Sequence, residues 1–439
     1  MSQSALLRSR RFLPLFATQF LGAFNDNVFK NAIVIFIAFT LADRAGVNSS
    51  VLVILAGGIF ILPFFLFSAT AGQIADRWEK SGLIRHIKSA EIVIMTLGAA
   101  AFLLQNVWLL LFVLFLMGAQ SAFFGPLKYG ILPQHLAEGE LTGGNGLIQM
   151  GTYIAILGGT MLGGVLIAIR EAGPLATGST VLVIAVAGRV ASAYIPPADA
   201  SDPALRIDLN IFRQTVRIMQ YAVEARAVFV AVIAISWFWF TGATFLSLVP
   251  TYARDVIAGN ELVATILLTA FSVGIGTGSL LCEKLSRGRI EPGLVPIGAL
   301  GICLAGVDLH FAEIVNGTGG VQDAATFLGA PGNWRVIADL TLIGLFGGVY
   351  IVPLYAMVQS RSAPAHRARI IAANNVLNAL FMVASALLVI GLMQAGATPR
   401  DIFLMTGLAT AVVAAALCAA LPEFVLRCRA WLRPGPAGS

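Results

Sequence analysis

Long apolar stretches alternate with short polar connections along the whole chain. A helix needs about 20 apolar residues to cross the hydrocarbon core of a bilayer, and these stretches are long enough for that. The pattern therefore predicts an all-α membrane protein with twelve transmembrane helices. We expect them at residues 12–42, 51–75, 88–106, 108–132, 143–169, 175–197, 227–255, 262–282, 293–312, 335–358, 371–395 and 400–422.

The composition agrees with this interpretation. Of the 439 residues, 58% are hydrophobic and only 11% are charged, whereas soluble domains are about 45–50% apolar and about 25% charged. The four cysteines form no CxxC pair, and no metal-ligand spacing or catalytic set of His, Ser and acid residues stands out. We therefore expect no cofactor, no bound metal and no enzymatic activity.

Basic residues gather in alternate connections and at both ends of the chain. Lysine and arginine are enriched in the cytoplasmic loops of membrane proteins. We therefore expect a multi-pass protein of the bacterial inner membrane, with both termini and these connections in the cytoplasm. This distribution accounts for the net charge of +6 without a nucleic-acid partner. The residues are Arg8, Arg10, Arg11, Arg77, Lys80, Arg85, Lys88, Arg206, Arg213, Arg217, Arg226, Lys284, Arg287, Arg289, Arg361, Arg367, Arg369, Arg427, Arg429 and Arg433.

The longest polar connection follows the sixth predicted span and divides the chain into two halves. We expect an N-terminal six-helix bundle at 1–197, a cytoplasmic linker at 198–226, a C-terminal six-helix bundle at 227–422 and a cytoplasmic tail at 423–439. Apolar positions at helical spacing within the linker predict an amphipathic helix near residues 206–223.

The two halves repeat each other in sequence. PLKY at 126–129 and PLY at 353–355 end corresponding spans, and a pair of amides four residues apart opens the next span in each half. These amides are Asn145 and Gln149 in the first half, and Asn374 and Asn378 in the second. Two six-helix halves related by an axis along the membrane normal are typical of transporters that bind their substrate between the halves.

The first span carries one polar stripe. At 100° per residue, Gln19, Asp26 and Lys30 fall within about 40° of one another, and Asn27 and Asn31 widen the arc. An Asp or a Lys at the centre of a spanning helix costs about 2.5–3.5 kcal/mol, so the stripe must face other helices or a wet cavity. Asp26 and Lys30 are four residues apart and are expected to pair. Two readings stay open, an ion pair that fixes helix packing and a lining of the transport path.

The loop GQIADRWEK after the second span resembles the signature of the major facilitator superfamily, with Glu79 where a glycine is usual. The resemblance implies that Gly72, Asp76, Arg77 and Lys80 form a gate that latches the two halves. The alternative is ordinary positive charge on the cytoplasmic side. GSLLCEKLSRGR in the second half is a version of the same loop, with Glu283 in the place of the acid.

Two further polar features stand inside or near spans. Lys128, next to Tyr129 in FFGPLKYGILPQ, either extends toward the interface along its own stem or binds a phosphate. We expect Glu91 and Arg189 at the membrane interface.

QFLGAFNDNVFKNA and FGPLKYGILPQ-x7-LTGGNGLIQ resemble motifs of the lysophospholipid transporter family within that superfamily, in a form like the transporter portion of fusions with an acyltransferase and an acyl-carrier-protein synthetase. The resemblance implies a flippase, working by alternating access, that moves lysophosphatidylethanolamine and lysophosphatidylglycerol from the outer to the inner leaflet for reacylation. It implies substrate contacts at Asp26, Asn27, Lys128 and Tyr129. Span seven has no charge from Ser236 to Val249, which leaves Lys30 as the basic partner of Asp26.

We therefore predict a monomeric lysophospholipid transporter, surrounded by membrane lipids, with an acyltransferase or acyl-carrier-protein synthetase as its functional partner. Its predicted substrate site combines Asp26, Asn27, Lys30, Asn31, Lys128, Tyr129, Gln149, Asn374 and Asn378. Two alternatives stay open, a proton-coupled exporter of drugs or small metabolites with Asp26 as the proton carrier, and a non-transporting membrane anchor of a lipid-modifying enzyme.

Overall fold

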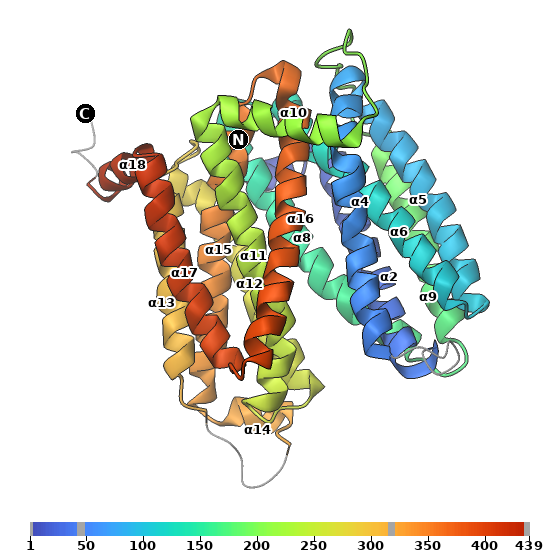
Figure 1. Ribbon diagram of the computed structural model, residues 1–439, viewed down its shortest axis with the longest axis vertical. Helices are drawn as coiled ribbons and strands as arrows, with labels where there is room; N and C mark the ends of the chain where they lie inside the picture. The colour runs from blue at the N-terminus through green and yellow to red at the C-terminus, as the bar shows by residue number, and fades with distance from the viewer. Residues whose placement is uncertain (1–2, 42–48, 315–320, 434–439) are drawn as a thin grey trace. The chain divides into compact units, whose positions relative to one another are not determined.

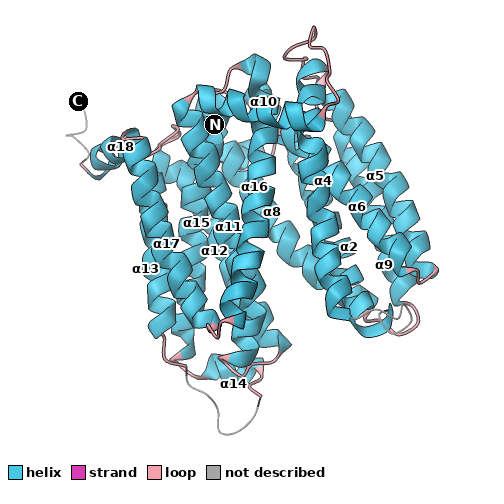
Figure 2. Ribbon diagram, in the orientation of Figure 1, coloured by secondary structure: helices cyan, strands magenta, loops and turns pink. Residues whose placement is uncertain are grey.

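The computed structural model describes residues 3–41, 49–314 and 321–433, and these residues are almost entirely helical (Figures 1 and 2). Twelve helices in the described part of the chain are long and apolar enough to cross a membrane, which confirms the predicted fold class. They are α2 (Leu13–Phe36, continued by the π-helix Ile37–Leu41), α4 (Ser49–Arg77), α5 (Lys80–Leu103), α6 (Val107–Gly130), α8 (Glu138–Ile167), α9 (Gly173–Ala193), α11 (Arg226–Asp255), α12 (Glu261–Ser286), α13 (Leu294–Phe311), α15 (Asn333–Arg361), α16 (Arg367–Gln394) and α17 (Pro399–Ala420).

Short helices lie before, between and after the spanning ones. They are α1 (Gln3–Leu6), α7 (Leu132–His135), α10 (Ile211–Glu224), α14 (Ala324–Gly329), the 3-10 turn Pro364–His366 and α18 (Glu423–Leu432). Asn210 caps α10, because its side chain accepts a hydrogen bond from the Arg213 backbone N–H. The amphipathic helix expected in the linker is thus present.

The chain packs into two compact units. The first comprises Met1–Ala137, Ile154–Ala225 and Ser362–Val376, and the second comprises Glu138–Tyr153, Arg226–Arg361 and Leu377–Ser439. Two helices belong to both units, because α8 changes unit after Tyr153 and α16 changes unit after Val376. The division of the chain into bundles at 1–197 and 227–422 stays a prediction.

In the first unit, α2 packs against α9 and α6, α5 packs against α9 and α6, and α4 packs against α6. The apolar side chains of these helices form one buried cluster, in which the rings of Phe29 and Phe102 meet edge to face with their centroids 5.4 Å apart. Such pairs add about 0.5–1.5 kcal/mol beyond the burial of their area. The cluster holds α2, and with it the polar stripe, in a fixed orientation.

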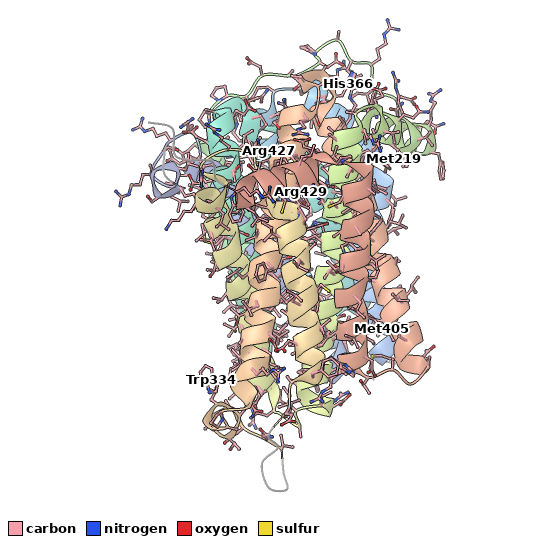
Figure 3. All side chains as sticks on the ribbon, turned by 90° about the vertical axis from the view of Figure 1, so that its left-hand side faces the viewer. Met219, Trp334, His366, Met405, Arg427 and Arg429 are labelled. Atoms are coloured by element: carbon pink, nitrogen blue, oxygen red, sulfur yellow. The ribbon has the colours of Figure 1, made fainter. Side chains whose placement is uncertain are left out.

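In the second unit, α12 and α15 approach each other so closely that their backbones touch. A methyl group on Gly278 would overlap the carbonyl group of Leu345, and one on Gly274 would overlap the carbonyl group of Thr341. Small residues allow spanning helices to come this close. The C-terminal helix α18 joins the same unit, because its Arg427 (Figure 3) pairs with Glu291 at 2.7 Å.

We expect Gly278→Ala to destabilise the protein, because its Cβ has no space and α12 and α15 must separate. Overpacking of this kind costs about 1–3 kcal/mol. The matched control is Gly391→Ala, since a Cβ on Gly391 in α16 would meet nothing within 4 Å. The measurement is thermal unfolding of the two purified variants in detergent, and equal melting temperatures would contradict the close approach.

Candidate functional site

A network of buried polar side chains joins α2, α5 and α6 in the first unit. At its centre is Glu91, whose carboxylate lies 2.6 Å from the ammonium group of Lys88, and the two side chains are only 2% and 1% exposed. Asn25 donates a hydrogen bond of 3.0 Å to one oxygen of Glu91, and Gln120 donates one of 3.2 Å to the other. We call these four residues the Glu91 network. Charges survive in a dry interior only when they are paired and hydrogen-bonded in this way.

Ser121 connects the Glu91 network to Asp26 on the polar stripe. Its hydroxyl lies 2.7 Å from the Asp26 carboxylate, to which it donates, and 3.3 Å from the side-chain oxygen of Gln120. Asp26 itself is partly exposed. The stripe predicted from the sequence is therefore backed by a second layer of polar groups.

The prediction of an ion pair between Asp26 and Lys30 is wrong, because no such pair occurs among the residues that the structure describes. Asp26 is held instead by Ser121 from α6, and the Lys30 ammonium group lies 5.4 Å from the centre of the Phe60 ring. The partner of Asp26 is therefore Ser121 on the neighbouring helix α6, and not Lys30 on the same helix.

Lys128 repeats the arrangement of Lys30. Its ammonium group lies 4.5 Å from the centre of the Tyr129 ring, and the side chain is partly exposed. Neither lysine has a carboxylate within ion-pair distance in the described ranges. Aromatic faces attract cations, so these ammonium groups are held in place and still able to bind an anion.

The two amides next to the stripe hold backbone groups. Asn27 donates 2.7 Å to the Ala23 carbonyl in its own helix, and Asn31 donates 2.7 Å to the Thr160 carbonyl of α8. Both bonds contribute to packing within the first unit. A substrate contact of Asn27 or Asn31 stays a prediction.

Asp76 connects α4 to the start of α16 within the first unit. Its carboxylate accepts hydrogen bonds from the backbone N–H groups of Ala368 (3.1 Å) and Arg369 (3.3 Å), and from Nε of Arg369 at 2.9 Å. The side chains of Asp76 and Arg369 are 0% and 4% exposed. One acid therefore both caps a helix and pairs with a buried base.

Gly72 lies one turn before Asp76 and lets α4 and α16 touch. A methyl group on Gly72 would lie 2.8 Å from the Cβ of Ala372 and 2.9 Å from the Cα of Arg369. Arg369 also donates to Asp202 of the linker at 3.1 Å. The Asp76–Arg369 contact thus gathers α4, the linker and α16 at one place.

The other predicted gate residues lie in different surroundings. The Arg77 guanidinium lies 4.9 Å from the centre of the Trp78 ring, whereas Lys80 is buried and donates to the Asp199 carbonyl (3.0 Å) and to Ser201 (2.8 Å). Glu283 lies far along the chain, on α12 of the second unit.

Glu79, the departure from the family signature, begins α5. It accepts hydrogen bonds from the backbone N–H groups of Ser81 (2.9 Å), Gly82 (2.6 Å) and Ala198 (2.8 Å). Partial burial alone would raise its pKa, but these hydrogen bonds and that of the Ser81 hydroxyl hold the pKa below the ordinary value. The glutamate joins the start of α5 to the linker.

The remaining predicted site residues are divided between the units. Asn374 is buried in the first unit, and Gln149 is buried in the second. Asn378, also in the second unit, accepts a hydrogen bond of 3.0 Å from Ser236. Asn145 and Gln359 exchange two hydrogen bonds, of 2.6 and 3.1 Å, between α8 and α15.

Lys88 does not lie in a polar loop as predicted, and Glu91, whose place at the membrane interface stays a prediction, is buried within the same helix. The structure begins α5 at Lys80, eight residues before the expected start of the span, so both residues lie inside the helix. Their spacing of three along a helix was a signal of pairing. In the described ranges, no group of three His, Cys, Asp or Glu residues could hold a metal ion.

Comparisons with known proteins agree with this architecture. A family model described as "Transmembrane secretion effector" matches residues 5–318. Lysophospholipid transporter LplT of Serratia proteamaculans is 28% identical over 81% of both chains, and that of Photorhabdus laumondii is 29% identical over 69% of both. The resemblance to lysophospholipid transporters that the motifs indicated is confirmed.

Solved structures share the fold at low sequence identity. The Escherichia coli fucose:proton symporter FucP superposes with a TM-score of 0.68, 16% identity and coverage of 93% of this chain and 98% of its own. The human organic anion transporter MFSD10 superposes with a TM-score of 0.72, 14% identity and coverage of 93% and 99%. Twelve helices of the described residues could cross a membrane, and the relatives are bacterial transporters, so the protein is a multi-pass inner-membrane protein. The chain belongs to the transmembrane secretion effector family, a family of transporters and not of enzymes, and has the major facilitator superfamily fold.

Proposed function

We propose that this protein is a lysophospholipid transporter that moves lysophosphatidylethanolamine and lysophosphatidylglycerol from the outer to the inner leaflet. The observation that carries the proposal is the pair of lysines, Lys30 and Lys128, that lie over aromatic rings without a carboxylate partner in the described part of the chain. A phosphodiester is the anion that such ammonium groups bind as point charges. Asp26, a partly exposed carboxylate on the same stripe as Lys30, is suited to the ammonium group of ethanolamine.

The proposed mechanism uses the same residues. In this proposal the headgroup leaves water and binds Asp26, Lys30 and Lys128, while the acyl chain stays in apolar surroundings. Further proposed contacts are Asn27, Asn31, Tyr129, Gln149, Asn374 and Asn378. Alternating access would break and reform the Asp76–Arg369 contact, with Gly72, Arg77, Lys80 and Glu283 as gate residues. The transporter would work as a monomer with cytoplasmic termini, and deliver its product to an acyltransferase or acyl-carrier-protein synthetase.

The test is thermal stabilisation of the purified protein by a panel of lysolipids, diacyl lipids and soluble metabolites. A ligand at 100 times its Kd stabilises the folded state by about 2.7 kcal/mol. We expect lysophosphatidylethanolamine and lysophosphatidylglycerol to raise the melting temperature. Stabilisation by a soluble metabolite alone, or uptake that requires a pH gradient, would support an exporter instead.

We expect Lys128→Gln to weaken the lysolipid response, because it removes one of the two ammonium groups assigned to the phosphate. Lys284→Gln is the matched control, since Lys284 is exposed near the end of α12. The measurement is the lysolipid concentration that gives half of the maximal stabilisation, together with flipping of labelled lysolipid in proteoliposomes. Equal values for the two variants would remove Lys128 from the site.

A further inference from the structure

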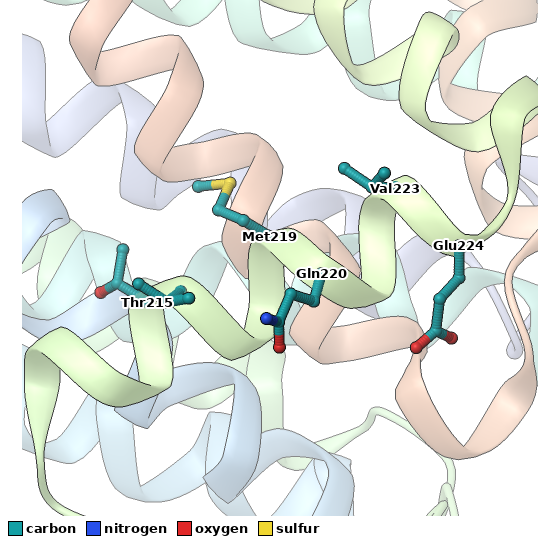
Figure 4. A pocket seen from close by; sticks show the side chains of 6 residues that line it. Thr215, Met219, Gln220, Val223 and Glu224 are labelled. Atoms are coloured by element: carbon teal, nitrogen blue, oxygen red, sulfur yellow. The ribbon is translucent and has the colours of Figure 1, made fainter.

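The linker helix α10 (Ile211–Glu224) has an apolar face that is only half covered by protein. Gln214, Ile218 and Ala222 are buried on one side of the helix. A second line of apolar side chains is left on the surface, and Phe212 is 86% exposed. This exposed stripe consists of Leu209, Phe212, Val216 and Val223, which are exposed, and of Met219, which is partly exposed (Figure 4 labels Met219 and Val223).

The place of α10 in the chain sets it at the membrane boundary. Only Ala225 separates the end of α10 from α11, which is long and apolar enough to cross the bilayer. A helix joined to a spanning helix by one residue cannot lie far from the headgroups. Figure 1 shows α10 running across the end of α4, which it contacts. That direction is the one an interfacial helix takes.

The charges next to the stripe match an anionic surface. At 100° per residue, Arg213 and Arg217 lie on the flank of α10 between the exposed stripe and the buried face, and both side chains are exposed. Arg206 precedes the helix and Arg226 follows it, whereas the acids of this segment are Asp208, which is ion-paired with Arg213, and Glu224. An exposed aromatic and aliphatic stripe beside arginines is the pattern of helices that bind anionic bilayers.

We propose that α10 is an interfacial helix that inserts its exposed stripe into a leaflet rich in anionic phospholipid. The occupant of this face is the bilayer itself, with acyl chains against Phe212, Val216 and Val223 and phosphates near Arg213 and Arg217. The proposal is independent of what the protein transports, because it concerns the linker and not the polar stripe of α2.

Fluorescence quenching by lipids with brominated acyl chains tests the proposal on the full chain. The variants are Phe212→Trp, on the exposed stripe, and Gln220→Trp, an exposed position of the same helix outside it. The signal of the added indole is the difference from the parent protein, which has six native tryptophans. Both variants are first checked for an unchanged melting temperature, since exposed positions tolerate substitution.

In proteoliposomes of brominated phosphatidylethanolamine and phosphatidylglycerol, we expect the added indole of Phe212→Trp to be quenched several-fold more strongly than that of Gln220→Trp. Replacing phosphatidylglycerol by phosphatidylcholine with the same bromine content should reduce the difference. Equal quenching of the two variants would overturn the proposal. Absence of quenching at Phe212→Trp would also overturn it and leave the stripe to a protein partner.

Discussion

Asp76→Ala should destabilise the protein strongly and reduce its transport. The substitution leaves the Arg369 guanidinium, which is 4% exposed, without its main counter-charge, and it removes the cap of the Ala368 and Arg369 backbone N–H groups. Loss of one partner of a buried pair costs about 3–5 kcal/mol. Asp202, which also accepts from Arg369, should keep the loss near the lower end. The measurements are thermal unfolding in detergent and lysolipid flipping in proteoliposomes.

Asp255→Ala is the matched control, because Asp255 is exposed and pairs with the neighbouring Arg254. Exposed ion pairs contribute about 0–1 kcal/mol, so this variant should unfold almost as the parent does. The double variant Asp76→Ala with Arg369→Leu removes both buried charges and should regain much of the stability. If it also regains transport, the contact is structural and not a gate. An Asp76→Ala protein as stable as the control would show that the contact contributes little.

Glu91→Leu should be the second severe substitution, since it leaves the Lys88 ammonium group buried and unpaired. The expected loss is again about 3–5 kcal/mol, because Asn25 and Gln120 lose their acceptor as well. We also expect weaker lysolipid binding. Without Glu91 the side chain of Gln120 is no longer fixed, so Ser121, which contacts it, positions Asp26 less firmly. Melting temperature and lysolipid affinity measure the two effects.

The pair exchange Lys88→Met with Glu91→Leu separates packing from binding. Well-packed apolar residues often replace a buried ion pair at little cost, so stability should recover in part. Lysolipid affinity should stay low if the Glu91 network positions Asp26, and return to the parent value if the network only packs helices. Glu261→Leu, at an exposed acid in the first turn of α12, serves as the control and should cost less than about 1 kcal/mol.

Hydropathy predicted the twelve helices because the bilayer imposes one simple requirement on each of them. The ends of the helices were less predictable, and the third span shows why. Its polar first residues, from Lys80 to Lys88, looked like a loop, but the helix begins at Lys80 with Glu79 as its cap. Lys80 and Lys88 are both buried, since each finds hydrogen-bond partners inside the protein. Hydropathy does not register such partners.

The site was predictable where the partners are close in sequence or where a motif marks the residue. The stripe on α2 and the importance of Asp76 came from the sequence in this way. The partner of Asp26 did not, because Ser121 lies on another helix, and spacing along α2 favoured Lys30 instead. For the same reason the sequence did not predict that the amide of Asn31 donates to the Thr160 carbonyl of α8.

The Asp76–Arg369 contact joins residues that are 293 positions apart in the chain. At a synthesis rate of about 5–20 residues per second, the ribosome adds that length in about 15–60 s. During this interval the nascent chain holds a carboxylate at the end of its second span with no guanidinium to meet it. The first unit therefore becomes complete only late in biogenesis, when the eleventh span has been inserted, and until then water, lipid headgroups or an insertion factor must solvate that acid.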